Sequence, residues 1–224
     1  MISTPRILAA ALGLAAACGA SAATFQNGSF ELNSLGSPTY AEVTGAGVTG
    51  WTAVTPGFEW FAPATYGGAP GPLGLAAEGS YAVDLAFVSS VGGGLSQTFD
   101  TTIGTEYAVS FAAGTSNFAG RSGTGLIIAT VDSGAPTFFA AVANASAPIA
   151  WSTYGFSFVA TGAQTKLSFL NDQDGDSHFA FVDAVQVSAV PEPHEWAMMA
   201  SGLALVGWIA RRRREPRGAS VARA

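Results

Sequence analysis

Cysteine is nearly absent from this chain. Cys18 is the single cysteine among 224 residues, and it lies in an apolar stretch near the N-terminus. If that stretch is removed as a leader, the rest of the chain has no thiol, which excludes disulfides, thiolate metal sites and cysteine nucleophiles. Histidine is almost as scarce, since His178 and His194 are the only two. A catalytic centre therefore has few candidate acids or bases, and we do not expect an enzyme.

Basic residues are almost missing between residues 23 and 189. This segment has twelve acids against two bases, Arg121 and Lys166, for a net charge of −10. Such a surface repels phosphate backbones, so the sequence predicts no nucleic-acid partner. The chain from Arg211 onward has six arginines and one glutamate, a net charge of +5. We interpret that basic tail as a membrane-topology signal.

Helical periodicity is absent from the same middle segment. It is rich in Gly, Ser, Thr, Ala and aromatic residues and poor in Lys, Glu and Leu, a composition that disfavours helices. Alternating apolar and polar residues instead predict short strands separated by glycine-rich turns. The candidate strands are 25–31, 51–55, 81–88, 95–101, 107–111, 126–131, 137–142, 154–158, 167–169 and 179–187. We predict one all-β domain over residues 23–189, an antiparallel sandwich.

One glycine- and proline-rich segment, Ala62 to Gly79, does not fit this strand pattern. It reads as a long loop on the sandwich. Long loops on a rigid scaffold are either functional or mobile, and the sequence leaves both alternatives open.

The N-terminus has the layout of a secretory signal. Arg6 precedes an apolar run from Ile7 to Ala17, and the small residues up to Ala22 follow it. We predict a signal peptide over residues 1–22 that directs export across the inner membrane, with cleavage after Ala22. Lipid attachment at Cys18 is the alternative, although the alanines before Cys18 form a poor lipoprotein box.

The C-terminal segment, residues 190–224, combines a proline motif, an apolar run and clustered arginines. The apolar run, Trp196 to Ala210, has tryptophans near its ends and arginines beside it, as membrane anchors do. Its length, about 22 Å as a helix against ~30 Å of hydrocarbon, leaves an apolar helix packed on the domain as the alternative. The order of these features resembles the PEP-CTERM sorting signal of Gram-negative bacteria. The residues that carry the resemblance are Pro191, Glu192, Pro193, Arg211, Arg212, Arg213 and Arg214.

That resemblance implies a transmembrane helix over 196–210 and an exosortase as processing partner. The protein would then be anchored transiently in the membrane before it reaches the cell surface or the extracellular space. The tail continues ten residues past the last clustered arginine, to Ala224, which is a modest departure from the pattern.

Five short motifs in the middle segment occur in a recognisable order. They are NGSFE (27–31), GW (50–51), LSQTF (95–99), YAVSF (107–111) and FVDAVQV (181–187). Together they resemble the galactose-binding-like jelly rolls, especially the bacterial choice-of-anchor C group and related plant cell-wall carbohydrate-binding proteins. The resemblance covers residues 25–188. It implies a jelly-roll β-sandwich that binds polysaccharide without catalysis.

Asp183 stands out because strand parity aims its carboxylate towards the core, together with Phe181 and Val185. A buried carboxylate must be protonated, paired or metal-bound. The jelly-roll resemblance implies a structural Ca²⁺ held by Glu31 and Asp183. The alternative is that Asp183 lies at a strand end or bulge and bonds to backbone amides. The acidic segment 171–176 is either a hairpin turn or part of a second calcium site.

Sugar binding needs flat aromatic faces beside hydrogen-bonding side chains. The candidate aromatics are Trp51, Trp60, Phe61, Tyr66 and Trp151, with Glu59 and Gln97 as polar partners. Trp60 and Tyr66 flank the glycine-rich loop, so we predict a ligand-binding site from Trp60, Tyr66 and Glu59. The alternative is that these aromatics belong to the sandwich core.

We therefore expect an exported envelope or matrix protein whose sandwich binds polysaccharide non-catalytically. Two alternatives remain. One is a structural biofilm protein without a specific ligand, and the other is a carbohydrate-active hydrolase with a carboxylate pair.

Overall fold

The computed structural model describes residues 24–87, 91–121, 124–132, 134–142, 147–173, 178–191, 201–206, 208–209 and 211. The predicted signal peptide lies outside these residues. So does most of the predicted sorting signal, including Glu192, Pro193 and the arginines from Arg212 to Arg214.

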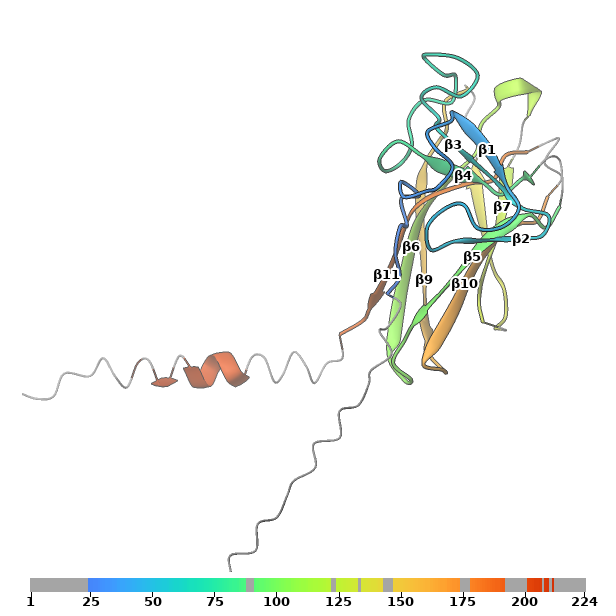
Figure 1. The fold of residues 1–224 in the computed structure, drawn as a ribbon. Coiled ribbons are helices and arrows are strands. Elements are labelled where there is room, and N and C mark those ends of the chain that lie inside the picture. The colour runs from blue at the N-terminus through green and yellow to red at the C-terminus, as the bar shows by residue number, and fades with distance from the viewer. Residues whose placement is uncertain are drawn as a thin grey trace, which may run out of the picture.

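Two antiparallel sheets pack face to face, as Figure 1 shows. In spatial order, the six-stranded sheet contains β1 (Tyr40–Val43), β3 (Phe58–Phe61), β4 (Ala82–Asp84), β11 (Phe181–Ala189), β6 (Glu106–Gly114) and β9 (Ser152–Val159). The five-stranded sheet contains β2 (Thr52–Val54), β5 (Gly94–Asp100), β10 (Gln164–Asn171), β7 (Thr124–Val131) and β8 (Thr137–Val142). A short 3-10 turn, η2 (Phe118–Gly120), precedes β7. The prediction of an all-β antiparallel jelly-roll sandwich is confirmed.

The main core lies between the sheets and is built by alternation along the strands. Val109 and Phe111 point inward from β6, and Leu167 and Phe169 point inward from β10. Phe111 and Phe169 meet across the sandwich with their ring centroids 4.8 Å apart. Aromatic pairs in this geometry add stability beyond the area that they bury.

The last strand departs from regular alternation at a bulge. Its register with β6 shifts between Asp183 and Gln186, and Ala184 has a φ of 51°. As a result Phe181 lies on the outer face of its sheet, whereas Val185 packs in the core between the sheets. The sequence-based prediction that these residues share one face is wrong, because a bulge inserts one residue and reverses the parity beyond it.

The predicted first strand, residues 25–31, is also absent. These described residues form a turn and irregular backbone, with left-handed φ values at Asn27 (54°) and Phe30 (59°). The Asn27 side chain holds this turn by donating to the carbonyls of Leu32 and Thr49. The segment joins the sandwich through a hydrogen bond from the Val185 N–H to the Gly28 carbonyl, 2.9 Å long.

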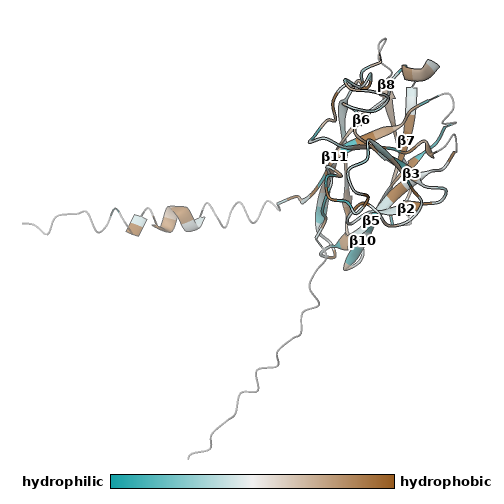
Figure 2. Ribbon diagram, turned by 45° about the horizontal axis from the view of Figure 1, so that its top comes forward, coloured by the Kyte–Doolittle hydropathy of each residue, from teal (hydrophilic) through white to brown (hydrophobic). Residues whose placement is uncertain are grey.

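Residues 201–206 and 208–209 are helical, within the predicted transmembrane segment. Leu203, Leu205, Val206, Trp208 and Ile209 expose apolar side chains there. Figure 2 shows hydrophobic colouring over part of this helix. Among the described residues, no helix is both long and apolar enough to cross a membrane.

Candidate functional site

Strand β3 sends its side chains alternately to the two faces of its sheet. Phe58 and Trp60 pack in the core between the sheets, whereas Phe61 packs on the outer face. Glu59 is half-buried and shares the outer face with Phe61, because residues two apart in a strand point the same way. Adjacent residues such as Glu59 and Trp60 therefore cannot face one ligand together.

Trp60 is correspondingly unavailable to a sugar in this structure, which corrects its assignment as a binding residue. Its side chain is 0% exposed and stacks on Tyr81 with the ring centroids 4.0 Å apart. Its indole N–H donates to the Phe30 carbonyl at 3.0 Å. These contacts make Trp60 a core residue, which is the alternative that the sequence left open.

A second hydrophobic cluster covers the outer face of the six-stranded sheet. We call it the outer aromatic cluster; its members are Tyr40, Phe61, Tyr66, Phe118, Trp151, Phe179 and Phe181, together with Leu73, Ala82 and Ile149. The rings form a continuous chain of contacts. Tyr66 lies at its centre, 5.8 Å from Tyr40, 5.6 Å from Phe61 and 6.3 Å from Phe118, centroid to centroid. The buried members of the cluster form a second core, while the partly buried members supply an aromatic surface; these are Tyr40, Tyr66, Phe118 and Trp151.

The glycine-rich segment 62–79 packs onto this cluster. Leu73 is 1% exposed, and its carbonyl accepts a hydrogen bond from the Ile149 N–H at 2.9 Å. The Trp151 indole N–H donates to the Leu75 carbonyl, also at 2.9 Å. The loop that the sequence could not assign is therefore fastened to the aromatic surface, and it places Tyr66 there.

Three carboxylates lie in register beside the aromatic surface. Glu42 pairs with Glu59 across β1 and β3, and Glu59 pairs with Asp84 across β3 and β4. Directly opposed residues on one face have Cβ atoms about 4.5–5.5 Å apart. Tyr40 donates its hydroxyl to Glu42 at 2.9 Å. Burial, and then the carboxylates of Glu42 and Glu59, raise the pKa of Tyr40, so the phenol remains a hydrogen-bond donor.

The charges of Glu59 and Asp84 also reach Tyr66. Burial raises the pKa of Tyr66, and the two carboxylates raise it further, whereas Arg121 lowers it. The Arg121 guanidinium lies 4.2 Å from the centroid of the Phe179 ring. A cation over an aromatic face is electrostatically favourable. Arg121 therefore places a positive charge beside the outer aromatic cluster, in addition to the negative charges of the carboxylates.

Asp84 is the most buried member of the acidic row, with 2% exposure. Burial raises its pKa to about 6, although N–H donors from Ala86 and Ala180, both at 3.0 Å, and the Arg121 charge oppose the shift. Asp84 thus gains and loses its charge in a mildly acidic range, beside Glu59.

Glu59 and Tyr66, two of the three residues predicted for ligand binding, lie on the same face. The structure adds Tyr40, Asp84 and Arg121, which the sequence analysis did not predict as ligand-binding residues. The parity of Tyr40 and Glu42 along β1 is a signal in the sequence, but the register that sets Glu42 beside Glu59 is not. Aromatic rings flanked by carboxylates and a guanidinium can stack on a sugar ring and hydrogen-bond its hydroxyls.

Glu31 and Asp183, the predicted calcium ligands, both contact the segment before β4. Glu31 Oε1 accepts N–H bonds from Ser80 at 2.7 Å and Tyr81 at 2.9 Å. Asp183 Oδ2 accepts from the Glu78 N–H at 2.9 Å, and Oδ1 accepts from the Ala184 N–H at 2.6 Å. Burial raises the pKa of Asp183 to about 7. Asp183 thus lies at a bulge and bonds to backbone amides, as the alternative interpretation expected.

These residues fit a calcium ion in donor chemistry. Carboxylate oxygens are the hard ligands that Ca²⁺ prefers, and a buried carboxylate with a raised pKa gains from a nearby cation. Among the described residues, however, no group of three or more His, Cys, Asp or Glu side chains is arranged to hold a metal.

The chain resembles several solved carbohydrate-binding structures. The module TmCBM61, solved in complex with β-1,4-galactotriose, matches with a TM-score of 0.44 and 15% identity over 75% of this chain and 99% of that one. The CBM22-1 xylan-binding domain of Paenibacillus barcinonensis Xyn10C gives 0.42 and 16%, over 64% of this chain and 87% of that one. The C-terminal domain of EclA, a sugar-binding protein, gives 0.38 and 20%, over 55% and 87%.

A comparison with curated proteins finds no match. The family described as "Protein of unknown function (DUF642)" matches residues 23–188, which span the whole sandwich and most of the chain. The chain belongs to the DUF642 family.

Proposed function

We propose that this protein is a non-catalytic polysaccharide-binding module whose binding surface is formed by the partly buried rings of the outer aromatic cluster, Tyr40 and Tyr66, with the accessible acids Glu42 and Glu59. The observation that carries the proposal lies on the outer face of the sandwich, where Tyr40 donates to Glu42 at 2.9 Å and its ring lies 5.8 Å from that of Tyr66, centroid to centroid. Glu42 in turn lies directly opposite Glu59 across β1 and β3. The tyrosine rings would supply apolar faces, and Glu59 would accept hydrogen bonds from sugar hydroxyls. Arg121 would donate to ring or glycosidic oxygens.

Binding to soluble polysaccharides tests this directly. Affinity electrophoresis or calorimetry with β-1,4-galactan and xylan would use the domain over residues 23–189. Glu59→Gln and Tyr66→Ala should each weaken binding by about tenfold or more, since each removes at least one directed contact worth ~1–2 kcal/mol. Glu106→Gln, on an exposed position of β6, is the matched control and should bind as the unmodified domain does.

Three other outcomes bear on the proposal and its alternatives. Release of reducing ends from either polysaccharide, abolished by Glu59→Gln, would indicate a hydrolase. Undiminished binding by both variants would contradict the proposed surface. Absence of binding to any polysaccharide would favour a structural matrix protein.

We also propose that the scaffold carries a structural Ca²⁺ between Glu31 and Asp183. The support is their shared attachment to residues 78–81 and the raised pKa of Asp183. The ion would supply positive charge that stabilises both carboxylates in their ionised forms. Its test is given in the Discussion.

Export and processing belong to the same proposal. The charged, apolar and small-residue order of residues 1–22 supports secretion, and the Pro191–Pro193 motif with Arg211–Arg214 supports exosortase processing. Mass spectrometry of the protein from the native envelope would test both. A mature chain that still begins at Met1, or ends at Ala224, would contradict the corresponding step.

A further inference from the structure

A cavity opens where the two sheets part along one edge of the sandwich. It lies between β9, at the edge of the six-stranded sheet, and the turn that joins β7 to β8, at the edge of the other sheet. Its volume is about 390 Å³, within the ~300–1,000 Å³ typical of small-molecule sites. The described residues that line it include no member of the outer aromatic cluster or the acidic row. The cavity is therefore a separate feature of the molecule.

Farther along β8 and β9, aromatic residues fill the space between the edges of the two sheets. The Tyr154 hydroxyl of β9 donates to the Ala140 carbonyl of β8. Phe139 of β8 packs against Tyr154 at 6.0 Å and against Phe156 at 5.6 Å, centroid to centroid. Next along β9 comes Phe158, and the residues across the cavity from it are small. They are Ala129, Val131, Gly134, Ala135 and Thr137.

The cavity is thus a place where large side chains on one sheet are not matched by large side chains on the other. The space is open to solvent, because most of the residues that line it are exposed, namely Asp132, Gly134, Ala135, Thr137, Ser157, Val159 and Thr161. A single larger side chain at Ala135 or Thr137 would reach into this space. The small side chains therefore leave the space beside Phe158 accessible to a ligand.

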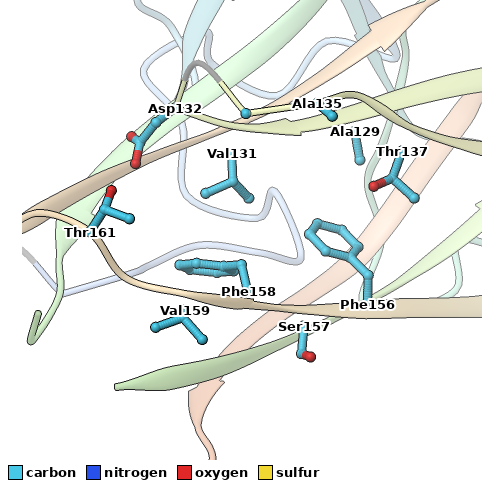
Figure 3. Close-up of a pocket in the computed structure, with 11 residues that line it drawn as sticks. Ala129, Val131, Asp132, Ala135, Thr137, Phe156, Ser157, Phe158, Val159 and Thr161 are labelled. Atoms are coloured by element: carbon cyan, nitrogen blue, oxygen red, sulfur yellow. The ribbon is translucent and has the colours of Figure 1, made fainter. Parts of the chain in front are cut away.

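The walls supply an aromatic face and polar groups in one concave space, as Figure 3 shows. Phe158 stacks on Tyr107 through one face, with centroids 5.5 Å apart and the planes 15° from parallel. Phe158 also lines the cavity. The side chains of Asp132 and Thr161 point toward one another at one end, and Thr137 lies near Phe156. Asp132 is fixed there because its Oδ1 accepts the Lys166 N–H at 2.7 Å.

The charge of these walls selects among ligands. Asp132 is the one ionisable side chain among the lining residues that the structure describes. A carboxylate accepts hydrogen bonds from hydroxyls but repels another carboxylate. The C–H groups of a sugar ring carry partial positive charge and suit the negative face of an aromatic ring. The chemistry therefore favours a neutral sugar over a uronic acid.

We propose that this cavity is a second carbohydrate site, one that binds a single neutral sugar ring against Phe158 with its hydroxyls on Asp132 and Thr161. It extends the proposed polysaccharide-binding function without depending on the outer surface. Two separate sites on one module would let it hold two chains, or two points on one chain, and raise its avidity for a polysaccharide matrix.

The test is an NMR titration of the isotope-labelled protein. The probes are the methyl β-pyranosides of galactose, glucose and xylose, with sodium galacturonate as the charged comparison. At least one neutral glycoside should shift the resonances of Phe156, Phe158 and Val131, and galacturonate should bind at least about tenfold more weakly. Ala135→Trp should abolish these shifts by filling the cavity. Thr98→Trp, at an exposed position of β5, is the matched control and should bind normally.

A conservative variant separates this site from the outer surface. Asp132→Asn retains an acceptor for the Lys166 N–H and should weaken glycoside binding while leaving polysaccharide binding at the outer surface unchanged. Glu59→Gln should do the reverse. The proposal is overturned if no neutral glycoside shifts the cavity resonances, if Ala135→Trp binds as the unmodified domain does, or if Glu59→Gln abolishes the glycoside shifts.

Discussion

Glu31 and Asp183 hold the same short segment from two sides. Glu31 accepts the N–H groups of Ser80 and Tyr81, and Asp183 accepts that of Glu78. The N-terminal segment and the last strand are thus joined through the backbone that leads into β4. A cation shared by the two carboxylates would tighten this junction, which makes thermal stability the natural measure of calcium binding.

Added calcium should raise the melting temperature of the domain. At a concentration 100 times the Kd, a ligand that binds only the folded state contributes about 2.7 kcal/mol. For a domain of this size that corresponds to a rise of roughly 5–10 °C. The rise should be lost in Glu31→Gln and Asp183→Asn and retained in the exposed-site control Glu106→Gln. Identical melting curves in calcium and in chelator would remove the metal from the proposal.

Trp60 should matter for stability rather than for ligand binding. Trp60→Ala should destabilise the domain by about 3–5 kcal/mol, because it empties a fully buried site and removes the donor to the Phe30 carbonyl. Trp60→Phe should cost less and, where the domain remains folded, should bind polysaccharide with unchanged affinity. Denaturant unfolding and calorimetry measure the two effects. A Trp60→Phe variant that folds normally but fails to bind would restore the original assignment.

The contrast between Glu59 and Trp60 shows which features of the site the sequence can predict. Alternation on β3 is visible in the sequence, and it already implies that these neighbours face opposite ways. Which face is inner depends on strand register, which no local pattern contains. The same reasoning explains β11, where a bulge at Ala184 separates Phe181 from Val185. The sandwich, the strand-rich composition and most strand positions follow from local patterns, because those patterns reflect burial directly.

The sequence does not predict which distant residues meet in the fold, for the same reason. The charge of Arg121 lowers the pKa of Asp84 although 37 positions separate the two residues in the sequence. The cavity beside Phe158 arises from small residues on a different sheet. Neither relationship leaves a periodic signal, since each depends on how the sheets are stacked.

Asp84 should make stability depend on pH. Its folded pKa, about 6, lies above the ordinary value of 3.8. The folded state therefore holds its proton more tightly, and Asp84 contributes stability that is complete below pH ~4 and lost as the pH rises through about 6. The change is on the order of 2–3 kcal/mol. Denaturant unfolding between pH 4 and pH 7 should show a shallower dependence for Asp84→Asn than for the unmodified domain.

The matched control for that experiment is Asp132→Asn, which changes an exposed carboxylate. It separates the effect of the buried position from that of the change in net charge. The raised pKa of Asp183 acts in the same direction and persists in Asp84→Asn, so the dependence should shrink rather than vanish. A steeper profile in Asp84→Asn would contradict the assigned direction of the shift.

Gly28 should be needed for the attachment of the N-terminal segment. A Cβ at this position would overlap the carbonyl oxygen of Val185, a backbone atom at the bulge of β11 that cannot move independently. Gly28→Ala should therefore push the segment away from β11 and destabilise the domain by about 1–3 kcal/mol, the usual cost of overpacking. Gly45→Ala is the control, because a Cβ there would meet nothing within 4 Å. Since the segment carries Glu31, the Gly28 variant should also lose the calcium-dependent rise in melting temperature, whereas Gly45→Ala should retain it. A Gly28→Ala domain as stable as the control would show that the N-terminal segment does not pack against the bulge.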